Sequence, residues 1–231
     1  MSAARSEKRR GGVLGFLRDL VVILLLAFLI SFLLKTFLVR SFFIPSSSME
    51  DTLQVDDRIL VNQLVPGMMD VKRGDIVVFQ DPGGWLNAPP SEPPTGFEWV
   101  LQSVGLAADT SHEYVVKRVI GVGGDRVACC DANGKITVNG VPIDEPYLKL
   151  PEGAPASELE FDVTVPEGSV WVMGDNRNAS KDSRYNQDQP GDGFVPEEEI
   201  VGRAFLLNWP LNRFGVLHNP EETFTGVESA G

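Results

Sequence analysis

The sequence predicts a mainly β protein with antiparallel sheets, preceded by one N-terminal transmembrane helix. Two observations support this fold class: one long apolar run near the N-terminus, and many short β-favouring runs divided by turn residues after it. A hydrophobic fraction of 43%, with 23 glycines and 16 prolines, is typical of a folded chain that is rich in turns. The bulk composition therefore excludes a disordered protein.

The apolar run extends from Leu20 to Val39 and contains one charged residue, Lys35. As a helix it would be about 30 Å long, which matches the hydrocarbon core of a bilayer. A buried core helix is disfavoured by the polar residues that precede the run. A cleaved signal peptide would end at the serines of 46–48, but the bulky residues at 42–43 lie between them and the run. We therefore expect a retained anchor over 19–39.

Charge is distributed unevenly along the chain. Residues 1–40 carry seven basic and two acidic side chains, a net charge of +5, whereas 41–231 carry 13 basic and 30 acidic ones, a net charge of −17. Positive flanks stay on the cytoplasmic side, so 1–18 should be cytoplasmic and 40–218 extracytoplasmic. An acidic body repels phosphates, which disfavours nucleic-acid binding.

The body is predicted to be built from short strands connected by turns. The predicted strands are 58–65, 75–79, 113–122, 126–130, 135–140, 161–165, 169–173 and 200–209. Asn-Gly within 131–135 predicts a hairpin turn, inside a β-hairpin extension that covers 126–165. Residues 80–112 form an insertion, and 219–231 are expected to be a flexible tail. The insertion contains Trp85, Phe97 and Trp99, which suit either a membrane interface or packing under the loop.

Cys129 and Cys130 are the only cysteines, and they are adjacent. Two ligands cannot close a zinc site, so no metal is expected. Two small strand residues on opposite faces are favoured over a vicinal disulfide, and the sequence leaves the redox state open.

The stretch IPSSSMEDTL, 44–53, begins five residues after the apolar run ends and contains three serines in a row. A serine nucleophile needs a base. The chain has only two histidines, His112 and His218, and no Gly-x-Ser-x-Gly elbow, so a Ser-His-Asp triad is disfavoured. The sequence leaves lysine as the other candidate base.

Lys117 lies in EYVVKRVIGV, where strand alternation puts it on the same face as Val115 and Val119 and opposite Arg118. This environment makes Lys117 a candidate for burial. A lysine base near neutral pH needs its pKa lowered by roughly 2–3 units, which desolvation can supply. The alternative is a lysine whose stem packs while its ammonium reaches water.

The stretch GDNRNASKDSR, 174–184, has the composition of a solvated loop. Asp182 and Arg184 are spaced to pair across a tight turn. Asn178, Ala179 and Ser180 also form a glycosylation sequon.

In this order and behind an anchor, these stretches resemble the type I signal peptidase family, the membrane-anchored bacterial leader peptidases with a Ser/Lys dyad. The matching segments are IPSSSMEDTL, RGDIVVF (73–79), YVVKRVIGVGGD (114–125), GDNRNASKDSR and GFVPEEEIVGRA (193–204). The resemblance implies a signal-peptidase-like catalytic body and a serine endopeptidase that removes signal peptides from exported preproteins through an acyl-enzyme. It implies no cofactor and a single-pass cell-membrane location. The expected partners are the lipid bilayer and signal peptides with small residues at −1 and −3, and no nucleic acid.

The resemblance also assigns residue roles. It implies Ser48 as nucleophile, Lys117 as general base, Ser46 with the Ser48 N–H as oxyanion donors, Ser180 as the residue that orients the base, Asp182 and Arg184 as a structural ion pair, and Ile44, Met49 and Val116 as pocket residues. Four positions depart from the family's frequent residues, and none carries a proposed catalytic group: Ser47, Asp51, Asn178 and Ala179 stand where glycine, proline, aspartate and asparagine are common.

Two alternatives stay open. A non-catalytic anchored β-domain that binds export or envelope components would keep Lys117 charged. A self-cleaving repressor would use the same chemistry but is disfavoured because it would carry a DNA-binding domain in place of an anchor. The preferred preproteins, the oligomeric state, the presence of a second such protease and the role of 80–112 are not determined by the sequence.

Overall fold

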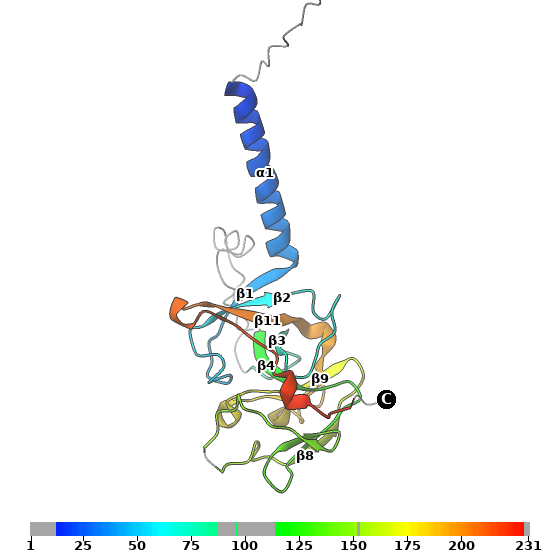
Figure 1. Cartoon of the computed structure of the whole chain (residues 1–231). Helices are drawn as coiled ribbons and strands as arrows, with labels where there is room; N and C mark the ends of the chain where they lie inside the picture. The colour runs from blue at the N-terminus through cyan, green and yellow to red at the C-terminus, as the bar shows by residue number, and fades with distance from the viewer. Residues whose placement is uncertain (1–12, 87–95, 97–113, 152, 229–231) are drawn as a thin grey trace, which may run out of the picture.

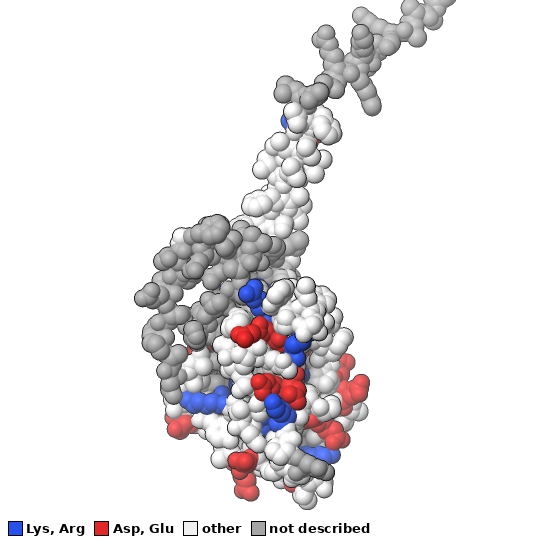
Figure 2. Space-filling model, turned by 90° about the vertical axis from the view of Figure 1, so that its left-hand side faces the viewer, with Lys and Arg blue, Asp and Glu red and all other residues white. Residues whose placement is uncertain are grey.

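The computed structural model describes residues 13–86, 96, 114–151 and 153–228. One long helix, α1 (Val13–Phe37), leads after a single residue into the first strand, β1 (Val39–Phe43), and projects away from the β body (Figure 1). Within the described residues, its window Gly15–Phe32 is the one segment long and apolar enough to cross a membrane, and none of it is buried. Most of the helix surface carries no charge, whereas acidic and basic side chains are mixed over the body (Figure 2). The helix begins at Val13, before the expected start at residue 19. It ends at Phe37 and not at Val39, which belongs to β1.

Two antiparallel sheets make up the body, which confirms the expected fold class. The larger sheet has the order β1-β2-β11-β3-β4-β9-β10, with β12 paired to β11, and the smaller has the order β7-β6-β5-β8. The larger sheet adds β2 (Arg58–Asn62), β3 (Ile76–Gln80), β4 (Tyr114–Val122), β9 (Ser169–Met173), β10 (Val195–Pro196), β11 (Ile200–Trp209) and β12 (Gly215–Val216). The smaller contains β5 (Arg126–Cys129), β6 (Ile136–Val138), β7 (Val141–Pro142) and β8 (Phe161–Thr164). Short 3₁₀ helices span Arg177–Ala179, Ser183–Tyr185, Glu197–Glu199, Leu211–Arg213 and Glu221–Phe224.

β4 lies inside the larger sheet, hydrogen-bonded to β3 on one side and to β9 on the other. Apolar side chains cover both of its faces: Val119 belongs to one buried cluster, and Ile120 to another. A strand covered on both faces buries successive residues rather than alternate ones. Lys117 and Arg118 are accordingly both buried, so the expected contrast between the two residues is wrong.

The start of the 80–112 insertion packs onto this sheet. Trp85 is 3% exposed and meets Phe79 edge to face, with ring centroids 5.6 Å apart. Of the two roles considered for Trp85, the structure supports packing in the core, because a ring so deeply buried has no surface to offer a membrane. Phe97 and Trp99 lie outside the described residues.

Two further expectations are corrected. Cys129 and Cys130 are joined by a vicinal disulfide; Cys130 lies beyond the end of β5, so the ladder does not hold the two sulfur atoms on opposite faces. The segment from Asn219 to Glu228 is also not a free tail. The Asn219 side-chain amide donates to the Asp75 carboxylate at 2.8 Å and to the Arg73 carbonyl at 2.9 Å, and Phe224 and Val227 pack on the core of the smaller sheet.

Candidate active site

Ser48 lies in a closed turn that follows β1. The Ile44 N–H donates to the Asp57 carbonyl and the Asp56 N–H donates back to the Ile44 carbonyl, both at 2.9 Å, which closes the segment at its base. Within it, the Glu50 N–H donates to the Ser47 carbonyl at 3.2 Å. The nucleophile candidate is therefore carried by a hydrogen-bonded turn whose two ends lie together.

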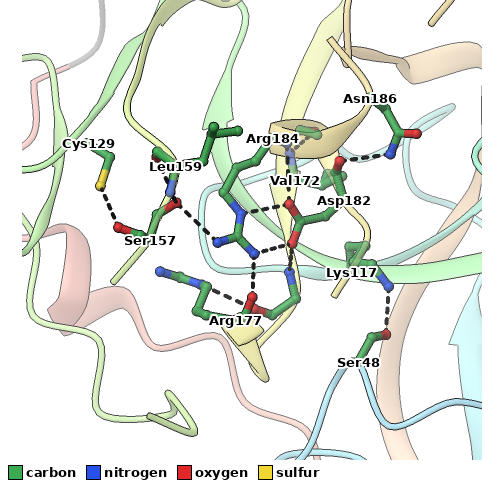
Figure 3. Close-up of polar contacts among 12 residues, drawn as sticks. Ser48, Lys117, Cys129, Ser157, Leu159, Val172, Arg177, Asp182, Arg184 and Asn186 are labelled. Carbon is green, nitrogen blue, oxygen red and sulfur yellow. Dashed lines mark hydrogen bonds and ion pairs between the residues drawn. The ribbon is translucent and has the colours of Figure 1, made fainter. Parts of the chain in front are cut away.

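The Lys117 amine and the Ser48 hydroxyl are in direct contact. Lys117 Nζ lies 2.7 Å from Ser48 Oγ and 2.9 Å from the Val116 carbonyl oxygen, and Figure 3 shows the two side chains pointing toward one another. Lys117 is 4% exposed and Ser48 is 7% exposed. These distances are within hydrogen-bond reach, which is the geometric requirement for a nucleophile and its base.

Burial lowers the pKa of Lys117 from 10.5 to about 8, because desolvation disfavours the ammonium. The carboxylates of Asp182 and Asp175 act in the opposite direction and raise this pKa, while Arg184 lowers it. A pKa of about 8 leaves a useful fraction of neutral amine near neutral pH. The alternative of a lysine whose ammonium reaches water does not fit this environment.

Two serines flank this pair in different ways. Ser46 Oγ lies 3.3 Å from Ser48 Oγ and is on the exposed side of the turn, so its hydroxyl is available beside the nucleophile. Ser180 is buried, and its hydroxyl makes no hydrogen bond among the described residues. The expected bond from Ser180 to Lys117 is thus not formed in this conformation, in which the amine bonds to Ser48 and Val116 instead.

Asp182 and Arg184 form the ion pair that their spacing suggested. Arg184 Nε and Nη2 donate to the two carboxylate oxygens of Asp182, both at 2.8 Å, with both side chains buried. Asp182 also accepts the Gly174 N–H at 2.9 Å, and Arg184 donates to the Arg177 carbonyl at 2.9 Å. Figure 3 shows the Arg184 and Asp182 side chains facing each other, and their bonds to Gly174 and Arg177 tie the pair to the 174–184 loop.

The expected pocket residues lie mostly in the core. Ile44 and Met49 are 2% and 1% exposed and pack in one apolar cluster with Leu53. Val116 is half-buried and packs against the same cluster. The 44–57 turn thus buries its apolar side chains, and the role of Ile44, Met49 and Val116 in substrate pockets stays a prediction.

Other candidate groups do not join this site. His218 is exposed and, in the part of the chain that the structure describes, makes no hydrogen bond to Ser48, while His112 lies outside that part. Among the described residues there is no group of three or more His, Cys, Asp or Glu side chains placed to hold a metal ion.

Arg118 and Asp175 form a second buried ion pair that the sequence did not reveal. Arg118 donates to the two oxygens of Asp175 at 2.8 and 2.7 Å. Asp175 also accepts the Thr52 hydroxyl at 2.5 Å, and the Arg118 guanidinium lies 3.9 Å from the centre of the Tyr147 ring. This pair ties the residue next to the candidate base to the turn that carries Ser48. The one available signal was the apolar character of 115–122 on both faces.

A buried amine in contact with a serine hydroxyl is the geometry that a serine nucleophile with a lysine base requires. The sequence matches the family described as "Signal peptidase, peptidase S26" over residues 17–209, and the chain belongs to this family. It is thus a serine peptidase, and the alternatives of a non-catalytic binding domain and of a self-cleaving repressor lose their support.

Two relatives of similar sequence agree with this assignment. The chain is 37% identical to signal peptidase I of Mycobacterium tuberculosis over 95% of this chain and 82% of that protein. It is 38% identical to a probable signal peptidase I-2 of Synechocystis, over 82% of this chain and 72% of that protein. A crystal structure of a signal peptidase I from Enterococcus faecalis matches with a TM-score of 0.38 at 26% identity, over 58% of this chain and 95% of that chain.

Proposed function

We propose that this chain is a membrane-anchored endopeptidase that removes signal peptides from exported preproteins, with Ser48 as nucleophile and Lys117 as general base. The single observation that carries the proposal is the contact of 2.7 Å between Ser48 Oγ and a buried Lys117 amine. Membership of the signal peptidase family supplies the substrate class.

In the first half of the reaction, Ser48 Oγ attacks the scissile carbonyl carbon and its proton passes to neutral Lys117 Nζ. The carbonyl oxygen becomes an oxyanion, which the Ser48 N–H and the Ser46 hydroxyl stabilise. The carbon–nitrogen bond then breaks, the departing amine takes the proton from Lys117, and the signal peptide stays on Ser48 as an ester. Water, deprotonated by Lys117, cleaves that ester and regenerates both side chains.

The anchor supplies the location. A basic segment before α1 and an acidic body after it support an N-terminus in the cytoplasm and a catalytic domain on the outer side. Ser48 follows the end of α1 by eleven residues, so the nucleophile stays close to the bilayer surface. An exported protein presents its cleavage site in the same zone. In this proposal, 1–18 is the cytoplasmic part and 40–218 the catalytic domain, with the smaller sheet as its extension.

The test uses the full-length protein in detergent with a preprotein that has small residues at −1 and −3. Ser48→Ala and Lys117→Met should each lower kcat by about a thousandfold or more, as expected for loss of a nucleophile or its base. Ser47→Ala is the matched control for the nucleophile. Lys72→Met is the control for the base, because Lys72 is an exposed lysine whose amine makes no hydrogen bond to the 44–57 turn among the described residues. Both variants should process normally. Normal processing by Ser48→Ala or Lys117→Met would refute the assigned dyad.

A further inference from the structure

Asn176 joins the loop after β9 to the turn that carries the nucleophile. Its side-chain amide donates to the Ser47 carbonyl at 3.1 Å, and its backbone N–H donates to the Ser48 carbonyl at 3.1 Å. These two carbonyls belong to the consecutive peptide units on either side of the Ser48 Cα. A single residue therefore holds both peptide planes that determine the backbone conformation of Ser48.

The first of these planes also carries the Ser48 N–H. A peptide unit is planar, and the bond between Ser47 and Ser48 is trans, so its N–H points away from its carbonyl. Donors on the Ser47 carbonyl therefore fix the direction of the Ser48 N–H. Glu50 provides one donor from within the turn and Asn176 provides the other from outside it.

The Ser48 N–H is free to receive a ligand. Within the described residues it makes no hydrogen bond, although the peptide that carries it is held tightly. A preorganised donor without a partner is suited to an oxygen that becomes negative during the reaction. A hydrogen bond accepted by the Ser47 carbonyl also polarises the same peptide and strengthens its N–H as a donor.

The two residues before Asn176 hold it against the turn that carries Ser48. Asp175 is tied to Thr52 and Arg118, and so to both the nucleophile turn and β4. Gly174 approaches so closely that a Cβ at this position would come within 2.5 Å of the Ser48 carbonyl oxygen and would also collide with the Ser180 side chain. The contact made by Asn176 is therefore built into the packing on both sides.

We propose that Asn176 is a positioning residue that directs the Ser48 N–H at the oxyanion of the reaction. This role rests on the proposed function, in which Ser48 is the nucleophile. The oxyanion exists in the transition state and not in the bound substrate, so the loss of Asn176 should reduce kcat and leave KM nearly unchanged. Lys117 has no hydrogen bond to Asn176 among the described residues, so the pH midpoint of the reaction should stay in place.

The experiment compares Asn176→Ala and Asn176→Asp with Asn178→Ala in the full-length protein. Asn178 is an exposed asparagine two residues further along the same loop, so it is a matched control. We expect kcat to fall by about 10- to 100-fold for Asn176→Ala, less than the loss of a whole oxyanion donor, with KM within about twofold. Asn176→Asp keeps the shape but replaces the donor by an acceptor facing a carbonyl, so it should be at least as slow. Asn178→Ala should behave as the wild type.

The proposal is overturned if Asn176→Ala matches Asn178→Ala in kcat per folded protein, or if KM rises while kcat is kept. A shift of the pH midpoint together with the loss of rate would also overturn it, because the residue would then act on the base. Ser48→Ala, measured in parallel, separates the two proposals. An active Ser48→Ala refutes the proposed function itself, whereas an inactive Ser48→Ala with an unaffected Asn176→Ala refutes only the role of Asn176.

Discussion

Arg184 donates two hydrogen bonds of 2.8 Å to the Asp182 carboxylate, and both side chains are buried beside Lys117. The two charges act on the pKa of Lys117 in opposite directions: Asp182 raises it and Arg184 lowers it. Arg184 thus offsets the effect of Asp182, so that a buried carboxylate can organise the 174–184 loop while the pKa of Lys117 stays lowered. Its role is electrostatic as well as architectural.

Removal of either partner should therefore move the pH dependence. Arg184→Met leaves Asp182 uncompensated, which raises the pKa of Lys117 and shifts the rise of kcat/KM to higher pH; Asp182→Asn shifts it to lower pH. Arg184→Met should also lower the free energy of unfolding by about 3–5 kcal/mol, because it leaves a buried charge without its partner. Both quantities are measured by pH–rate profiles and urea denaturation.

The matched control is the exposed pair of Arg126 and Asp162, whose side chains are 66% and 51% exposed. Arg126→Met should leave both the free energy of unfolding and the pH profile nearly unchanged, because exposed ion pairs contribute little. Equal effects at Arg184 and Arg126 would contradict the electrostatic role of the buried pair.

The wild-type protein should gain activity as the pH rises. The pKa of Lys117 is about 8 in the folded protein, and only its neutral form can accept the proton of Ser48. In the free enzyme, kcat/KM should rise about tenfold per pH unit well below the midpoint and level off above pH 8. A profile that is flat between pH 6 and 9 would show that no group with this pKa controls the reaction.

Lys117→Met should stabilise the protein while it abolishes activity. The pKa of Lys117 is lowered on folding, so the unfolded chain binds more protons between pH 8 and 10.5 and stability rises with pH across this window. Below pH 8, the folded protein bears the full cost of the buried ammonium, about 3 kcal/mol. Lys117→Met should recover most of this at pH 7 and very little at pH 11, as measured by chemical denaturation. A gain that does not depend on pH would contradict the assigned cause.

Ser180→Ala should change stability and rate in opposite directions. The hydroxyl is buried without a hydrogen bond among the described residues, so its removal should raise the free energy of unfolding by about 1 kcal/mol. We propose that this hydroxyl finds its partner in the Lys117 amine once Ser48 gives up its proton, so kcat should fall. An unchanged kcat in a stabilised variant would remove Ser180 from the reaction.

Much of the fold could be predicted from the sequence. The strands β9 and β11 have the predicted bounds, because β-branched and aromatic residues there are delimited by turn residues. β1 was missed because Val39 was assigned to the apolar run and no turn residue separates that run from the rest of Val39–Phe43. The docking of 219–228 was missed because it depends on Asn219 reaching Asp75, a contact between distant parts of the chain.

The site was less predictable than the fold. The motifs predicted Ser48 and Lys117 as the reacting pair, and strand alternation predicted that Lys117 would be buried. Alternation failed for Arg118, because tertiary packing covers both faces of β4. The contacts of Asp175 and Asn176 with the nucleophile turn could not be predicted either. A loop that is exposed to water and a loop that binds a neighbouring turn can have the same polar composition.

The joint between α1 and β1 has a consequence for how the enzyme selects a bond. Only Leu38 separates the helix from a strand that is paired to β2 along all five of its residues, so no flexible tether lets the body rise or tilt freely. In the proposed topology, the distance between the bilayer surface and Ser48 is therefore fixed. Peptide bonds at that distance from the bilayer should be cleaved, and otherwise suitable bonds nearer to it or farther from it should not. Residues inserted at Leu38 should change this distance and leave the reaction at Ser48 unchanged.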